Sequence, residues 1–168
     1  MIMSRDLSKS SDIINKSQLF LGMISFVAGS WEYLANRPWN TTYFLTKFSF
    51  LEKYFHKLPG IYGSLGGNAP EFLHVLAFSL LSAGVASQNR RNRIIICLFW
   101  FGVDSSLELC QKYPALIHEH FIQHFSDSYM IGLLDSYFRQ GLYDKFDLLA
   151  IMLGSVTFFL LAELTSKK

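Results

Sequence analysis

Long apolar stretches separated by short polar segments dominate the chain. Four of them approach the roughly 20 residues that a helix needs to cross the hydrocarbon core of a bilayer. We place these predicted spans at about residues 17–36, 69–87, 94–111 and 146–164. Helices this apolar on every side would need large surrounding cores in water, and 168 residues cannot supply several such cores. The pattern therefore predicts an all-α, polytopic membrane bundle of four transmembrane helices, forming one domain over residues 1–168.

Two longer connections, at about residues 37–68 and 112–145, separate these spans. In the first, apolar residues recur at helical spacing from Phe44 to Leu58, which is typical of an amphipathic helix on a membrane surface or of a lid packed on the protein. In the second, residues 129–143 are apolar and aromatic but too short to span, which favours an interfacial or re-entrant segment. We therefore expect interfacial helices in both loops.

Basic residues gather at the chain's tail segments and in one short connection. Lys and Arg occur at residues 5–16, 90–93 and 167–168. Short loops rich in Lys and Arg remain in the cytoplasm, so both termini are predicted to be cytoplasmic and the two longer loops to face outward. The sequence Ala28-Gly29-Ser30 resembles a signal-peptide cleavage site, but bulky Trp31 directly after it favours an uncleaved span.

Composition narrows the class of protein further. Hydrophobic residues make up 51 % and charged residues only 17 % of the chain, against about 25 % charged in soluble domains. Because 15 Lys and Arg face 13 Asp and Glu, no cationic excess exists to bind nucleic acid. Two cysteines are too few for a disulfide framework or a four-thiolate metal site. The composition therefore favours a cell-membrane protein whose partners are membrane lipids.

Polar residues within the predicted spans gather toward one end of the bundle. With the orientation above, the outer halves contain Glu32, Glu71, His74, Asp104, Glu108, Gln111, Asp144 and Asp147. The inner halves of the last three spans are nearly free of ionisable groups apart from Glu163. Ionisable residues inside a membrane are costly and usually functional. We therefore predict a functional site at the outer end.

Helical spacing places these polar residues on shared faces. Asp104, Glu108 and Gln111 lie at positions i, i+4 and i+7, while Glu71 and His74 are three residues apart. Turning these faces away from lipid forms a shared, outward-facing pocket. Crowded carboxylates in a low dielectric raise one another's pKa, which suits proton transfer, cation binding, or the binding of a hydroxyl-rich or amine-bearing headgroup.

Some of these residues have structural explanations. Asp144 is suited to cap the fourth helix, with Asp147 in its first turn, and Asn68 with Glu71 resembles a capping box around Pro70. Glu32 is explained equally well by a position among lipid headgroups. By contrast, Asp104 and Glu108 lie late in a helix, where the helix dipole disfavours anions. They need a positive partner, for which His74 is the first candidate and Arg139 or Lys145 the others.

Histidines in the second outer loop raise the question of a metal site. His120 and His124 are four residues apart, which would place two imidazoles on one helical face and suits zinc. No cysteine and no His-Glu-x-x-His pattern accompanies them, and a polar surface helix explains them as well. No other cofactor is expected.

Several motifs resemble those of the VanZ-like membrane proteins, a family named for a protein of glycopeptide (teicoplanin) resistance. They are Phe72-Leu73-His74, Ala77-Phe78-x-Leu80-Leu81, Glu108-x-x-Gln111, Asp144-x-x-Asp147-Leu148-Leu149-Ala150 and Gly154. Glu71 stands near the place where the family often has Lys, and Ile151 replaces a frequent Asn. The resemblance implies a divergent bacterial cytoplasmic-membrane protein of four or five helices that acts on the cell envelope.

The leading hypothesis is thus a cell-envelope membrane protein whose acidic, His-containing pocket binds a lipid headgroup, a glycopeptide or an envelope precursor. The predicted ligand-binding residues are His74, Asp104, Glu108, Gln111, Asp144 and Asp147. The alternative is an intramembrane enzyme in which His74, Glu108 and Asp147 perform acid–base chemistry on a lipid-linked substrate. A small proton-coupled carrier and a purely structural subunit are further possibilities.

Overall fold

The protein is described by a computed structural model that covers residues 14–36, 39, 49–55, 59–63, 66–86, 88–120, 122–125, 129–141 and 143–166. Its elements are α1 (Lys16–Asn36), η2 (Ser49–Leu51), α3 (Glu52–Phe55), α4 (Ala69–Val85), α5 (Arg90–Lys112), α6 (Pro114–His120), η4 (Ile122–Phe125), α7 (Tyr129–Gln140) and α8 (Lys145–Thr165). The described residues contain helices and no strand, which confirms the all-α prediction. The four long helices coincide with the four predicted apolar segments to within a few residues.

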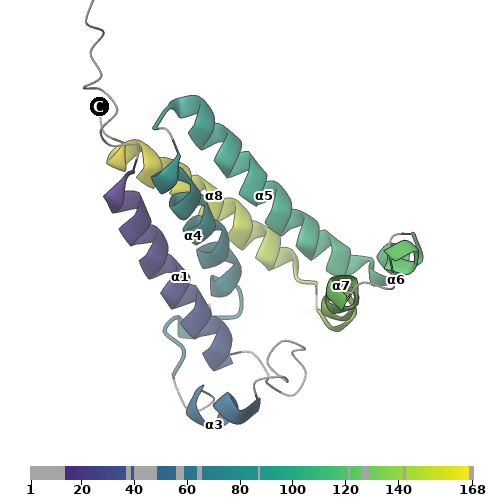
Figure 1. The fold of residues 1–168 in the computed structure, drawn as a ribbon. Helices are drawn as coiled ribbons and strands as arrows, with labels where there is room; N and C mark the ends of the chain where they lie inside the picture. The colour runs from purple at the N-terminus through teal and green to yellow at the C-terminus, as the bar shows by residue number, and fades with distance from the viewer. Residues whose placement is uncertain are drawn as a thin grey trace, which may run out of the picture.

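Helix α4 lies at the centre of the bundle. It packs against α1 on one side and against α8 and α5 on the other. Figure 1 shows that α1 and α5 diverge toward the end of the bundle that bears α3, α6 and α7. Helices α4 and α8 lie between these two outermost long helices.

Two helices among the described residues are long and apolar enough to cross a membrane, namely α5 and α8. Only 11 % of the most apolar stretch of α5 and 33 % of that of α8 is buried within the chain. The core helix of a soluble protein is mostly buried. Helix α4 is apolar but shorter, with 17 residues. These two helices favour a membrane protein.

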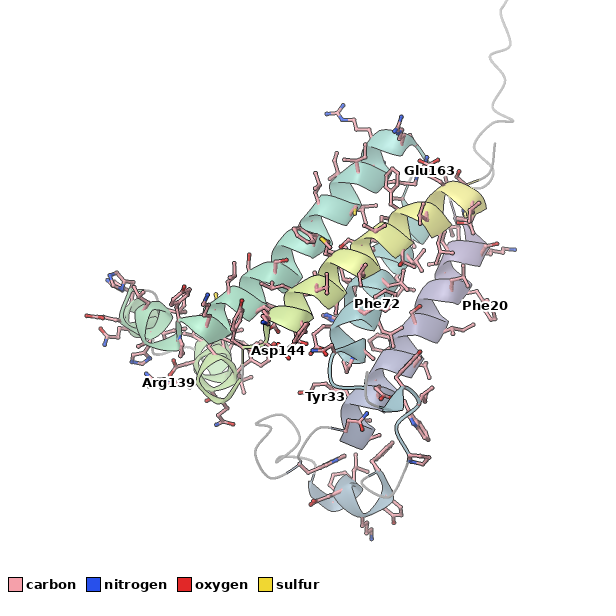
Figure 2. All side chains as sticks on the ribbon, turned by 180° about the vertical axis from the view of Figure 1, so that it is seen from behind. Phe20, Tyr33, Phe72, Arg139, Asp144 and Glu163 are labelled. Carbon is pink, nitrogen blue, oxygen red and sulfur yellow. The ribbon has the colours of Figure 1, made fainter. Side chains whose placement is uncertain are left out.

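Helix α1 buries its polar and small residues and exposes its large apolar ones. The buried positions are Gln18, Gly22, Ser25, Gly29 and Glu32. The exposed ones include Phe20, Met23, Ile24 and Val27, and Figure 2 shows Phe20 pointing away from the other helices. A helix in water shows the opposite distribution, so the outer face of α1 is suited to an apolar surrounding.

Small residues allow the helices to approach closely. A Cβ atom added to Gly22 would lie 2.9 Å from Cγ of Leu81 on α4, and one added to Gly154 would lie 2.6 Å from the backbone oxygen of Phe72. Small residues at such contacts are typical of helix pairs inside membranes. Around the second contact, α4 and α8 form the apolar core, which consists of Leu76, Leu80, Ala83, Phe158 and Ala162.

Polar contacts fasten one end of the bundle. Asn15 Nδ2 donates to the backbone oxygen of Thr165 at 2.8 Å, and the backbone N–H of Asn15 donates to Gly84 O at 2.7 Å. Arg93 Nη2, at the start of α5, lies 2.9 Å from Glu163 Oε1 near the end of α8. The starts of α1 and α5 and the ends of α4 and α8 therefore meet at this end.

The connections differ in part from the predictions. Of the amphipathic helix predicted from Phe44 to Leu58, the structure describes only the short helical turns over residues 49–55, and the remaining positions lie outside the described residues. The aromatic segment after residue 128 forms α7, which ends at Gln140.

Candidate functional site

A cavity of about 450 Å³ opens between α1, the first half of α4 and the second half of α5, with α7 at its edge. Its walls are largely apolar and include Phe26, Leu34 and Leu107. Polar groups from three helices also line it: Tyr33 from α1, Glu71 and His74 from α4, and Asp104 and Glu108 from α5. The cavity therefore combines an apolar wall with an acidic end.

The carboxylates of Glu71 and Glu108, which line this acidic end, converge with that of Asp147, which lies outside the cavity lining. One oxygen each of Glu71, Glu108 and Asp147 lies within 4.8 Å of the other two. The three residues come from α4, α5 and α8, and Glu108 and Asp147 are only 5 % and 4 % exposed. Sequence spacing placed each of them at the outer end, and packing of the three helices brings them together. We call this set the carboxylate triad.

Asn68, immediately before α4, connects the triad to the start of α8. Its Nδ2 donates to Asp147 Oδ1 and lies 3.4 Å from Asp144 Oδ2. The predicted capping box between Asn68 and Glu71 is therefore wrong, because Asn68 has helical backbone angles and makes no side-chain cap on α4. Its amide instead forms charge-assisted hydrogen bonds with α8. The sequence analysis missed this role of Asn68.

Asp144 caps helix α8, as its position in the sequence suggested. Its side chain caps α8 by accepting a hydrogen bond from the backbone N–H of Phe146 at 2.9 Å. It lies beside the triad through Asn68, but the triad oxygens come from Asp147 and not from Asp144. Capping and the orientation of Asn68 together explain this residue.

His74 contacts Asp104 in the lining of the cavity. His74 Nδ1 lies 3.3 Å from Asp104 Oδ1, with 47 % of the histidine side chain exposed and 6 % of the aspartate. The imidazole packs edge-on against Phe78, with ring centroids 4.5 Å apart. His74 was the first partner expected for the late acids of α5, and the structure confirms this for Asp104. The other candidate, Arg139, pairs instead with Asp135 inside α7.

Tyr137 of α7 is a second residue that the sequence analysis missed. Burial of its phenol, together with the negative charges of Glu108 and Glu71, raises the pKa of Tyr137, and its hydroxyl forms a hydrogen bond with Gln111. The phenol therefore stays protonated and can donate to an anionic or hydroxyl-bearing ligand. Gln111 itself is packed against Gly141, where an added Cβ would lie 2.5 Å from Gln111 Oε1.

Glu32 lies inside the bundle, not among headgroups. It is fully buried, and its Oε2 accepts a hydrogen bond from the backbone N–H of Ile61 at 2.7 Å. Oε1 accepts one from Asn36. Glu32 thereby holds the segment before α4 against α1.

The histidines of the second loop do not share one helical face. Helix α6 ends at His120, and His124 lies in the separate turn η4, so the predicted i, i+4 arrangement is wrong. His120 Nδ1 instead lies 3.1 Å from Leu116 O. Among the described residues, the group of side chains arranged to hold a metal ion is the carboxylate triad.

His118 joins α6 to α7. Its Nδ1 lies 2.9 Å from Asp135 Oδ1, and Arg139 Nε lies 3.0 Å from both oxygens of the same carboxylate. Partial burial alone would raise the pKa of Asp135, but the hydrogen bonds and charges of Arg139 and His118 outweigh it and lower that pKa. This cluster fixes α7, and with it Tyr137, beside the pocket.

No protein-family model matches the chain, and no curated protein or solved structure shows significant similarity to it. The resemblance to VanZ-like proteins therefore stays a prediction that rests on the motifs quoted above. The fold and the pocket define the molecule as an all-α protein with two apolar helices of membrane-spanning length and an acidic, apolar-walled cavity.

Proposed function

We propose that this chain is a four-span membrane protein whose outward-facing pocket binds the headgroup of a membrane amphiphile, such as a lipid or a lipid-linked envelope precursor. The observation that carries the proposal is the convergence of Glu71, Glu108 and Asp147 at the end of an apolar-walled cavity. An amphiphile needs both parts: an apolar wall for its chains and polar groups for its head.

Two features support four spans. Helix α4 is apolar and lies between α1 and α8, and α1 exposes large apolar side chains where lipid would lie. The starts of α1 and α5, which carry Lys16 and Arg90, lie at the same end of the bundle, where Asn15 and Arg93 make their contacts. We assign this end to the cytoplasm by the positive-inside rule, which leaves the triad at the outer end.

The position of the pocket supports entry from the membrane. It lies where α1 and α5 diverge (Figure 1), and Figure 2 shows Tyr33 extending from α1 toward the side on which Asp144 and Arg139 lie. Such an opening between two spans would admit a headgroup while the chains stay in the bilayer. The resemblance to VanZ-like proteins supports a location in a bacterial cytoplasmic membrane and an action on the cell envelope. It also adds a glycopeptide to the candidate ligands.

Photo-crosslinking tests this proposal. Full-length protein in nanodiscs containing a photoactivatable lipid should be labelled within residues 25–34 of α1 and 104–108 of α5. Ser30→Trp, which fills the pocket wall, should remove this labelling, whereas Val27→Trp on the exposed face of α1 should not. Labelling spread evenly over the apolar faces, and unchanged by Ser30→Trp, would contradict the proposal.

The contact of His74 with Asp104 favours a second candidate function, an intramembrane acid–base enzyme. A histidine oriented by a buried carboxylate is a common general base, and the two groups lie 3.3 Å apart in the pocket lining. His74→Gln would then abolish turnover of a lipid-linked substrate while pocket labelling persists. Unchanged turnover by that variant would exclude this role.

A further inference from the structure

We infer that Glu71, Glu108 and Asp147 form a binding site for a hard divalent cation, Ca²⁺ or Mg²⁺, at the acidic end of the pocket. The inference deepens the proposed function and rests on it for the cation's role, since the cation would face the headgroup. The geometry of the cation site comes from the triad alone, so cation binding can be tested separately from headgroup binding.

The separations of the triad oxygens fit such an ion. Ca²⁺ binds oxygen ligands at roughly 2.3–2.6 Å, so that two ligands on opposite sides of it are about 5 Å apart. The three carboxylate oxygens lie within 4.8 Å of one another, so one Ca²⁺ between them can reach all three after at most a small movement of the side chains. Mg²⁺, with ligands at about 2.1 Å, needs the oxygens to draw slightly closer. Carboxylate oxygens are the ligands that both ions prefer.

Asp104 provides an independent indication of a ligand in the cavity. It lines the same cavity one turn before Glu108, and it is 6 % exposed. Neither of its carboxylate oxygens accepts a hydrogen bond from the described residues, and it contacts the half-exposed imidazole of His74. Buried carboxylate oxygens normally accept hydrogen bonds. The water ligands that Ca²⁺ and Mg²⁺ retain are suitable donors to them.

Three positive side chains that the structure describes toward this end of the bundle contact other groups. Arg139 binds Asp135, Lys145 Nζ lies 5.3 Å from the ring centroid of Phe146, and Lys112 Nζ lies 5.0 Å from that of Tyr143. Buried carboxylates this close repel one another strongly in a low dielectric. A divalent cation would place positive charge where these carboxylates gather.

Asn68 supports the ligand set from behind. Its amide donates to Asp147 Oδ1 and so fixes the orientation of that carboxylate, as residues around metal ligands commonly do. A cation held by protein carboxylates leaves positions open to phosphate oxygens of a bound molecule. The headgroup that the pocket binds would therefore carry a phosphate.

The test uses purified full-length protein in detergent, stripped of metal with a chelator. It is titrated with CaCl₂ or MgCl₂ against choline chloride of equal ionic strength. We expect one saturable divalent cation per chain, measured by equilibrium dialysis. At 100 times the dissociation constant, the folded-to-unfolded ratio should rise about 100-fold. Glu108→Gln and Asp147→Asn should weaken binding at least tenfold, whereas Asp135→Asn, outside the pocket, should not.

Two results would overturn the inference. Absence of saturable binding to the unmodified protein would show that the triad holds no divalent cation, and this outcome does not depend on the folding of any variant. Binding that persists in both folded triad variants would place the cation elsewhere. If lipid labelling of the pocket remains unchanged in the presence of the chelator, the headgroup proposal stands without the cation; if cation binding persists without labelling, only the headgroup proposal fails.

Discussion

Gly154 sets the distance between α4 and α8, and its substitution by alanine should separate them. A Cβ at this position would meet the backbone oxygen of Phe72 at 2.6 Å and also Cγ1 of Val75. The backbone oxygen cannot rotate away, so the helices must shift. Overpacking of this kind costs about 1–3 kcal/mol, while alanine returns about 1 kcal/mol over glycine within a helix. We expect a net loss of up to about 2 kcal/mol in the free energy of unfolding.

Gly102 offers a matched control on α5, because a Cβ added there meets no atom within 4 Å. Gly102→Ala should therefore be neutral or stabilise the protein by about 0.5–1 kcal/mol. The two variants should differ by the overpacking cost of about 1–3 kcal/mol, which corresponds to roughly 2–12 °C in Tm for a chain of this size.

Thermal unfolding in nanodiscs measures this difference. Since Asp147 lies two turns before Gly154 on α8, Gly154→Ala should also weaken divalent-cation binding, whereas Gly102→Ala should not. Equal melting temperatures for the two variants would refute the close approach of α4 and α8, and with it the assembly of the triad.

Three further expectations concern single side chains. Asn68→Ala should lower the free energy of unfolding by about 1.5–3 kcal/mol, because it removes a hydrogen bond to the buried carboxylate of Asp147; denaturant unfolding with unchanged stability would contradict this. Glu163→Gln should cost about 1 kcal/mol, since Arg93 is buried while Glu163 is partly exposed, and equal unfolding midpoints would show that the pair contributes nothing. The lowered pKa of Asp135 means that its stabilising contribution is complete above about pH 4 and is lost as the pH falls through the folded-state pKa; Asp135→Asn should flatten the pH dependence of Tm in that range, and an identical profile would exclude the effect.

The long helices follow from the apolar pattern because burial and membrane exposure both favour long apolar segments. Their ends depend on local chemistry. Helix α5 begins at Arg90, four residues before the start of the predicted span at 94, since Asn89 caps it by accepting a hydrogen bond from Asn92 N at 2.8 Å. Such caps lie outside the apolar stretch, so hydropathy alone does not locate them.

The candidate site was predictable only where helical spacing defined it. Glu108 and Asp147 lie on faces that helical spacing identifies, and both belong to the triad. Glu71 is explained equally well as an acidic residue in the first turn of a helix. Its place in the carboxylate triad depends on the crossing of α4 with α5 and α8, which the sequence does not show. Asn68 and Tyr137 reach the site through tertiary packing, for which a single sequence contains no spacing signal.

The central claim is that three carboxylates meet at the end of a pocket open to the membrane. Its most direct test is an electron-microscopy structure of the full chain in lipid nanodiscs, with and without Ca²⁺. The account predicts oxygens of Glu71, Glu108 and Asp147 within 4.8 Å of one another, with headgroup density between α1 and α5. Carboxylates that point apart into solvent, with side chains filling the space between α1 and α5, would contradict it.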